Sequence, residues 1–150
     1  MPTFIRKNPL FFVFIFPIVL DTTLTLIGQD ASYWRNFKTA NEMAPVYFIL
    51  AFSPILFIIG SLLWYIFLYW LVKKLKEPLN LILALTFMVG HTVGSSSWIR
   101  KILFDTGIYI IGDRASTTYS WVILVGYFVL VGVIGGLSIS YYIKHRSEYN

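Results

Sequence analysis

Two ionisable side chains lie inside long apolar runs, and their types suit acid–base chemistry. His91 lies in the run FMVGHTVGSSSW from Phe87 to Trp98, and Asp21 lies in an apolar run from Pro9 to about Ile27. A carboxylate beside an imidazole orients the ring, which can then exchange a proton at its other nitrogen. We therefore predict Asp21 and His91 as the catalytic residues.

Helical spacing assigns the polar neighbours of this pair to two stripes, because residues three or four apart share a helix face. The stripes are Asp21, Thr25 and Gly28 on one helix and His91, Ser95 and Trp98 on the other. If the stripes face each other, they form the walls of a polar pocket. The predicted binding residues are Thr25, Ser95 and Trp98 in the walls, Asn41 and Glu42 at the rim, and Arg100 at the mouth.

Other chemistries are open to the same residues. Ser95, Ser96 and Ser97 suggest a nucleophile beside His91. However, His91 and Ser95 lie one turn apart on one helix, and serines there can donate to helix carbonyls. Asp21, Glu42 and His91 together offer a metal only one histidine and mixed ligands, so we predict no metal site. A cofactor is not indicated, and the pair can also serve only to join two helices.

Composition places these residues in a membrane protein. The chain has 150 residues, of which 57% are hydrophobic and 13% are charged, whereas soluble domains carry roughly 25% charged residues. So much apolar surface suits lipid as the solvent. The absence of cysteine excludes disulfides and a thiol nucleophile. The formal charge of +5 comes from Lys and Arg at helix ends, so it indicates topology and not nucleic-acid binding.

We predict an all-α fold, a single transmembrane domain over residues 1–150. The expected spanning helices cover about 9–27, 45–72, 79–99 and 119–143. The first is read as an uncleaved helix, because no small-x-small cleavage pattern follows it. The second run is longer than the membrane core, and a tilt or a kink at Pro54 would absorb the excess. Aromatic residues near the ends predict interfacial anchors: Tyr33 and Trp34 in the first loop, and Trp64, Tyr65, Tyr69 and Trp70 in a belt.

The loops at 28–44 and 100–118 are expected on the outer side. In the second, charged and apolar residues alternate, which favours an amphipathic helix lying in the interface. The N-terminus, the 73–76 turn and the C-terminus carry seven of the 12 Lys and Arg residues. We expect the protein in the plasma membrane of the cell. The charge bias predicts that both termini lie in the cytoplasm. Asp21 and His91 then lie at matched depth, about 10 Å below the outer interface.

Small residues repeat every four positions on two of the helices. Gly90 and Gly94 form one pair, and Gly132, Gly136 and Ser140 form a ladder on the last helix. Such spacing lets helices approach closely. We predict packing within the chain as the main role. A homo-oligomer or a membrane partner bound through the last helix is the alternative.

Several of these features together resemble small uncharacterised prokaryotic four-helix integral membrane proteins. The shared pattern comprises Asp21, the GQ at 28–29, Tyr33-Trp34, Asn41-Glu42 with Pro45, and GHTVGSSSW at 90–98. The resemblance implies the fold and carries no activity with it. Glu42-x-x-Pro45 is also similar to the membrane-associated glutathione and eicosanoid enzymes, but position 39 is Thr where that family has Asn. Small multidrug exporters share the helix count but lack the long outer loop.

The expected function is to bind, or act on, a small polar or lipid-derived group in an outward-facing pocket at Asp21 and His91. Whether the chemistry is enzymatic is left open. One alternative is a small transporter or channel subunit in which Asp21 and His91 relay protons. The other is a structural partner subunit of a membrane complex.

Overall fold

The computed structural model describes residues 8–146, and within this range every regular element is helical. The elements are α2 (Pro9–Ile27), the 3₁₀ helix η1 (Phe37–Thr39), α3 (Tyr47–Phe52), α4 (Pro54–Lys74), α5 (Leu79–Asp105) and α6 (Arg114–Lys144). Of these, α2, α4, α5 and α6 are long and apolar enough to cross a membrane. The predicted all-α bundle of four spanning helices is therefore confirmed as the fold class.

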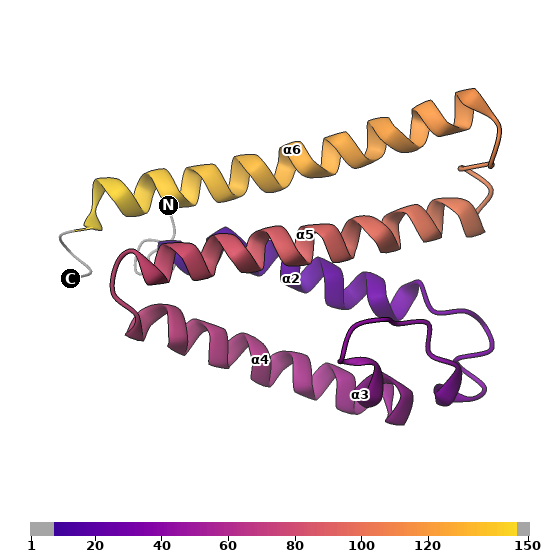
Figure 1. Cartoon of the computed structure of the whole chain (residues 1–150), viewed down its shortest axis with the longest axis horizontal. Helices are drawn as coiled ribbons and strands as arrows, with labels where there is room; N and C mark the ends of the chain where they lie inside the picture. Colours follow the sequence, from indigo (N-terminus) through magenta and orange to yellow (C-terminus); the bar gives the residue numbers. More distant parts are fainter. Residues whose placement is uncertain (1–7, 147–150) are drawn as a thin grey trace.

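The first long helix is the centre of the bundle. α2 packs against α4, α5 and α6, and its contact with α5 is the most extensive of the three. Figure 1 shows α5 between α4 and α6, with α2 behind it. The side chains of Val13, Phe14 and Ile18 on α2 are fully buried, although the helix is apolar all round. The helices packed against α2 therefore provide the surroundings of its few polar side chains.

Two apolar clusters hold the bundle at its two ends. The larger one joins the first half of α2 to the end of α4, to Ala84 of α5 and to Tyr142 of α6. The smaller one consists of Tyr33, Leu50 and Phe57, with Leu26, Ala40 and Val46 packed against it. It lies where the first loop and α3 fold against α4 (Figure 1). The loop is thus a packed part of the fold.

Pro54 breaks the second apolar run where only a kink was expected. Ser53 has an extended backbone, with φ −166° and ψ 133°, and its hydroxyl accepts the N–H of Ile55 at 3.2 Å. Serine as the N-cap and proline at the first helical position together start a new helix. Because Pro54 has no N–H, the carbonyl of Leu50 has no donor four residues on. The hydroxyl of Tyr33 donates to this carbonyl at 3.1 Å.

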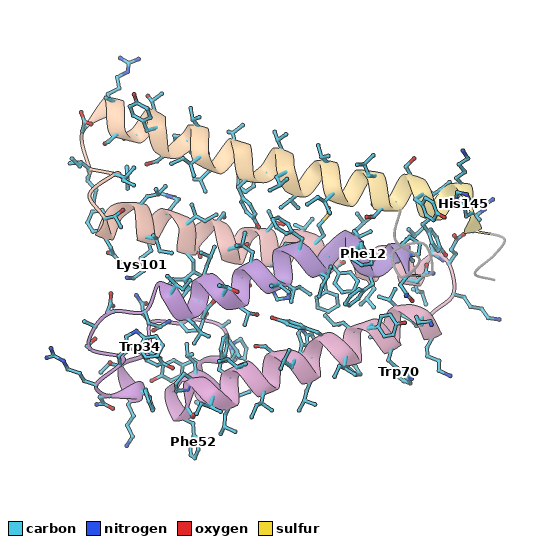
Figure 2. All side chains as sticks on the ribbon, turned by 180° about the vertical axis from the view of Figure 1, so that it is seen from behind. Phe12, Trp34, Phe52, Trp70, Lys101 and His145 are labelled. Carbon is cyan, nitrogen blue, oxygen red and sulfur yellow. The ribbon has the colours of Figure 1, made fainter. Side chains whose placement is uncertain are left out.

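The prediction that Tyr33 is an interfacial anchor is therefore wrong, because its side chain is 0% exposed and bonds inside the fold. Two of the four expected belt residues also point inward. The Tyr65 hydroxyl donates to Thr22 Oγ1, and the Tyr69 hydroxyl donates to Asn8 Oδ1 at 2.8 Å. Trp34 and Trp70, in contrast, are half exposed and lie at opposite ends of the bundle (Figure 2). Trp34 and Trp70 are thus open to the surroundings, whereas the three tyrosines bond inside the fold.

The interfacial helix expected at 100–118 is wrong. Residues 100–105 continue α5, a short loop follows, and α6 begins at Arg114. Gly107 and Gly112 have positive φ values of 74° and 86°, which only glycine adopts freely, so the loop turns at both. Lys101 bridges Asp105 one turn later at 2.5 Å and Asp30 of the first loop at 2.7 Å. The charges that suggested the end of α5 instead join its last turns to the neighbouring loop.

Candidate functional site

Asp21 of α2 and His91 of α5 lie in direct contact. The His91 Nδ1 atom is 2.8 Å from Asp21 Oδ2. The side chain of His91 is 25% exposed and that of Asp21 is 19% exposed, so the pair is half-buried at the flank of the bundle. Matched depth on the two helices predicts this contact, and the structure shows it.

The contact determines how the imidazole is oriented. An ionised carboxylate only accepts hydrogen bonds, so Nδ1 carries the proton that is shared with Asp21. In the neutral ring, Nε2 is then the unprotonated nitrogen. Within residues 8–146, Nε2 has no hydrogen-bond partner, and the ring stacks on Phe87 with 6.2 Å between centroids. Nε2 is thus the atom of the site that can accept a proton or a ligand.

The two predicted stripes face each other and pack tightly. A Cβ on Gly94 would lie 2.7 Å from both carboxylate oxygens of Asp21, so the carboxylate rests on the bare backbone of α5. Two turns further along α2, a Cβ on Gly28 would overlap the Trp98 ring. Thr25 and Ser95, between these levels, are buried. The stripes therefore form a closed seam between α2 and α5, and the pair lies at one margin of the seam.

Hydroxyl groups from the other two helices bond beside the pair. Tyr65 of α4 donates to Thr22, the residue next to Asp21. Tyr127 of α6 lies 2.6 Å from Ser95 Oγ, one turn along α5 from His91. All four long helices thus contribute polar groups at this level. Tyr65 and Tyr127 were not among the predicted site residues. The sequence does carry a signal for them, because a buried tyrosine hydroxyl inside an apolar span usually needs a hydrogen-bond partner.

The serine triplet donates to helix carbonyls and not to the imidazole. Ser95 donates to the carbonyl of His91, Ser96 donates to Val93 at 2.8 Å, and Ser97 donates to Gly94 at 2.6 Å. Since the Ser95 proton is engaged with a backbone oxygen, the Tyr127 hydroxyl is the donor to Ser95 Oγ. A nucleophilic serine activated by His91 does not fit this geometry.

The residues expected at the rim and the mouth of a pocket act elsewhere. Glu42 Oε1 accepts the N–H of Ala44 at 2.8 Å, and the backbone of Asn41 is held by Gln29. Within the described range, neither side chain bonds to Asp21 or His91. Arg100 lines two cavities beside the α5–α6 loop, of about 360 and 30 Å³, with Tyr109 in both. The structure does not bring these three residues to the pair.

A larger cavity, of about 520 Å³, lies at the end of the bundle where α2 and α5 begin and α4 and α6 end. Neither Asp21 nor His91 lines any of these three cavities in the described part of the chain. The pair is instead partly exposed at the surface of the bundle, with 25% of the His91 and 19% of the Asp21 side chain accessible.

Four of the five small residues in the two repeats face away from the rest of the described chain. A Cβ on Gly90, Gly132 or Gly136 would meet nothing within 4 Å, and Ser140 is exposed. Packing of these four residues within the chain was the wrong expectation. The close approaches occur at Gly94 and at Gly135, where an added Cβ would lie 2.6 Å from Met88 Sδ.

Among residues 8–146, no three His, Cys, Asp or Glu side chains gather closely enough to hold a metal ion. Comparison of the chain with protein-family models, with curated proteins and with solved structures gives no match.

Proposed function

We propose that the chain is a multi-pass integral membrane protein that binds a small polar or lipid-derived group at His91 Nε2 and exchanges a proton with it. Asp21 orients the imidazole. The observation that carries the proposal is the 2.8 Å contact between Asp21 and His91, half-buried at the flank of the bundle. A group dissolved in the membrane can approach from that flank.

A purely structural role for the pair is the competing interpretation, and its energetics are poor. An ionisable group at the centre of a spanning helix costs about 3 kcal/mol on insertion scales. A hydrogen bond between helices in a bilayer returns about 0.6 kcal/mol on average. The α2–α5 seam already has the tight contact of Gly28 with Trp98 to hold it. The pair therefore costs more than it contributes as a tie between helices.

We place the protein in the plasma membrane with both termini in the cytoplasm. The Lys and Arg bias supports this orientation, with seven of the 12 on the side of the termini and of the 73–76 turn. The pair then lies in the outer half of the membrane, so the group that it binds would come from the outer leaflet.

The test uses the fact that the chain has only two histidines. In a His145→Gln background, ¹⁵N-labelled histidine reports His91 alone in lipid nanodiscs. We expect Nδ1 of His91 to carry a proton, and Asp21→Asn should change the tautomer populations. Diethyl pyrocarbonate, which reacts with an unprotonated imidazole nitrogen, should modify His91, with the site assigned by mass spectrometry.

Two outcomes would contradict the proposal. One is a His91 that diethyl pyrocarbonate does not modify in folded protein but does modify after unfolding. The other is that the variants His91→Gln and Asp21→Asn, once shown to be folded, bind the same copurifying lipids as the wild type does.

The polar groups from four helices support a second candidate, a proton relay in a transporter or channel subunit. The Thr22–Tyr65 and Ser95–Tyr127 contacts flank the pair on α4 and α6. In proteoliposomes with an internal pH dye, this function requires proton flux that Asp21→Asn abolishes. A wild-type protein that carries no flux under an imposed pH gradient would exclude it.

A further inference from the structure

The 520 Å³ cavity lies at one end of the bundle, away from the Asp21–His91 pair inside it, and has a chemistry of its own. Its walls come from the first turn of α2, the last turns of α4, the α4–α5 turn and Tyr142 of α6. Figure 2 labels this end with Trp70 and His145, whereas Trp34 and Lys101 mark the other end. In a spanning bundle, helix ends lie at the level of the lipid headgroups.

One side of the cavity is basic. Lys73, Lys74 and Lys76 line it, and Glu77 is its single acidic residue. Glu77 is paired with Arg146, at 3.7 Å, instead of with the lysines. In the described part of the chain, none of the three lysines forms an ion pair. The cavity wall therefore carries positive charge that no acidic side chain among residues 8–146 pairs with.

The lining of the cavity also includes apolar side chains, with uncharged polar groups among them. Leu10, Phe11 and Val72 lie in its wall. Asn80 donates to the Tyr142 hydroxyl at 3.0 Å, which adds amide and phenol groups at the deep end. Lys73 is held over the Tyr69 ring, with its Nζ 5.3 Å from the ring centroid, and both side chains line the cavity.

We infer that this cavity binds a phosphate group with an apolar attachment, as in the headgroup of an anionic phospholipid. Lysines supply the charge for the phosphate, and the apolar wall receives the glycerol and the start of the acyl chains. Basic pockets between spanning helices are suited to such headgroups. A soluble phosphorylated compound shares the phosphate chemistry but not the acyl chains. The site is separate from the proposed Asp21–His91 function and does not depend on it.

The experiment measures thermal unfolding of the full chain in a neutral detergent, titrated with phosphatidylglycerol or with phosphatidylcholine. We expect phosphatidylglycerol to raise the unfolding temperature in a saturable way. The variant Lys73→Gln/Lys76→Gln should bind it roughly 25-fold more weakly, because each lysine near a headgroup contributes about a five-fold factor. Unfolding without added lipid checks that the variant is folded.

The matched control is Lys38→Gln/Lys144→Gln, which removes the same charge at exposed positions outside the cavity. It should respond like the wild type. Equal binding by the two double variants, or equal stabilisation by the two lipids, would overturn the proposal. Inorganic phosphate is the third arm and should give little stabilisation alone. If it protected the wild type as well as the lipid does, the lipid assignment would be wrong.

Discussion

The carboxylate of Asp21 rests against the backbone of Gly94, where a Cβ would come within 2.7 Å of both of its oxygens. The same carboxylate holds His91 Nδ1 at 2.8 Å. Three residues on two helices thus form one unit, in which the glycine makes room for the pair. Gly94 leaves space for a charged group, since the three atoms nearest to an added Cβ all belong to the Asp21 side chain.

Gly94→Ala should therefore separate Asp21 from His91. The added methyl group would overlap the carboxylate of Asp21 and force it to move, so we expect the free energy of unfolding to fall by about 1–3 kcal/mol, the usual cost of overpacking. The His91 tautomer populations, read by ¹⁵N NMR in the His145→Gln background, should shift as they do in Asp21→Asn. Gly90→Ala is the control, since a Cβ there meets nothing within 4 Å. A wild-type histidine spectrum in Gly94→Ala would refute the expectation.

The Asp21–His91 contact could be predicted from the sequence because the rise per residue of a helix fixes how deep each side chain lies in the membrane. Counting residues from the helix ends placed both side chains at one level, and the cost of an ionisable group in lipid pointed them inward. The same counting could not say which face of a helix carries its neighbours. Gly90 and Gly94 share a spacing rule, yet only Gly94 meets another helix. Periodicity identifies a face, and packing decides what that face touches.

The packing of Tyr33 in the first loop could not be predicted from the sequence, for a different reason. Tyr33 has the amphipathic character of an interfacial anchor, but the orphan carbonyl of Leu50 gives its hydroxyl an internal acceptor. That acceptor exists because Pro54 breaks the helix, and Ser53-Pro54 was a signal for a helix start that we read as a kink. Arg100 and Lys101 likewise suggested an end to α5, although a helix can continue beyond the membrane core.

Tyr33→Phe tests the contact that closes the first loop on α3. Its removal leaves the buried Leu50 carbonyl without a donor, which should lower the free energy of unfolding by about 1–3 kcal/mol. Reversible unfolding in mixed detergent–SDS micelles measures the change. Tyr47→Phe removes a comparable bond, from its hydroxyl to the carbonyl of Lys38 at 3.2 Å, at an exposed site. It should change stability by less than about 0.5 kcal/mol. Equal losses in the two variants would contradict the proposed role of the Leu50 carbonyl.

The burial of Tyr33 also predicts a response to alkaline pH. Removal from water raises the pKa of the Tyr33 hydroxyl above its ordinary value, near 10. The folded state therefore holds this proton more tightly than the unfolded state does. Its contribution to stability is complete below pH 10 and is lost as the pH rises through the raised pKa. Unfolding followed from pH 8 to 12 should show a smaller decline in Tyr33→Phe than in the wild type. Parallel curves would mean that Tyr33 does not contribute.

The start of α6 predicts the opposite dependence, at acid pH. Asp113 caps this helix, and its Oδ2 accepts the Ser116 N–H at 2.8 Å. This hydrogen bond lowers the pKa of the Asp113 carboxyl below its ordinary value, near 3.9. The stabilising contribution is present above that value and is lost as the pH falls through the lowered pKa.

Two substitutions of Asp113 separate the hydrogen bond from the charge. Asp113→Ala removes the cap and should lower the unfolding temperature already at pH 7, because the first turn of α6 loses an acceptor. Asp113→Asn keeps an acceptor at the same position without a titrating group. It should stay close to the wild type at pH 7 and lose less stability between pH 5 and 2. Fluorescence-detected unfolding in detergent over this range provides both comparisons. The cap assignment fails if Asp113→Ala unfolds at the wild-type temperature at pH 7.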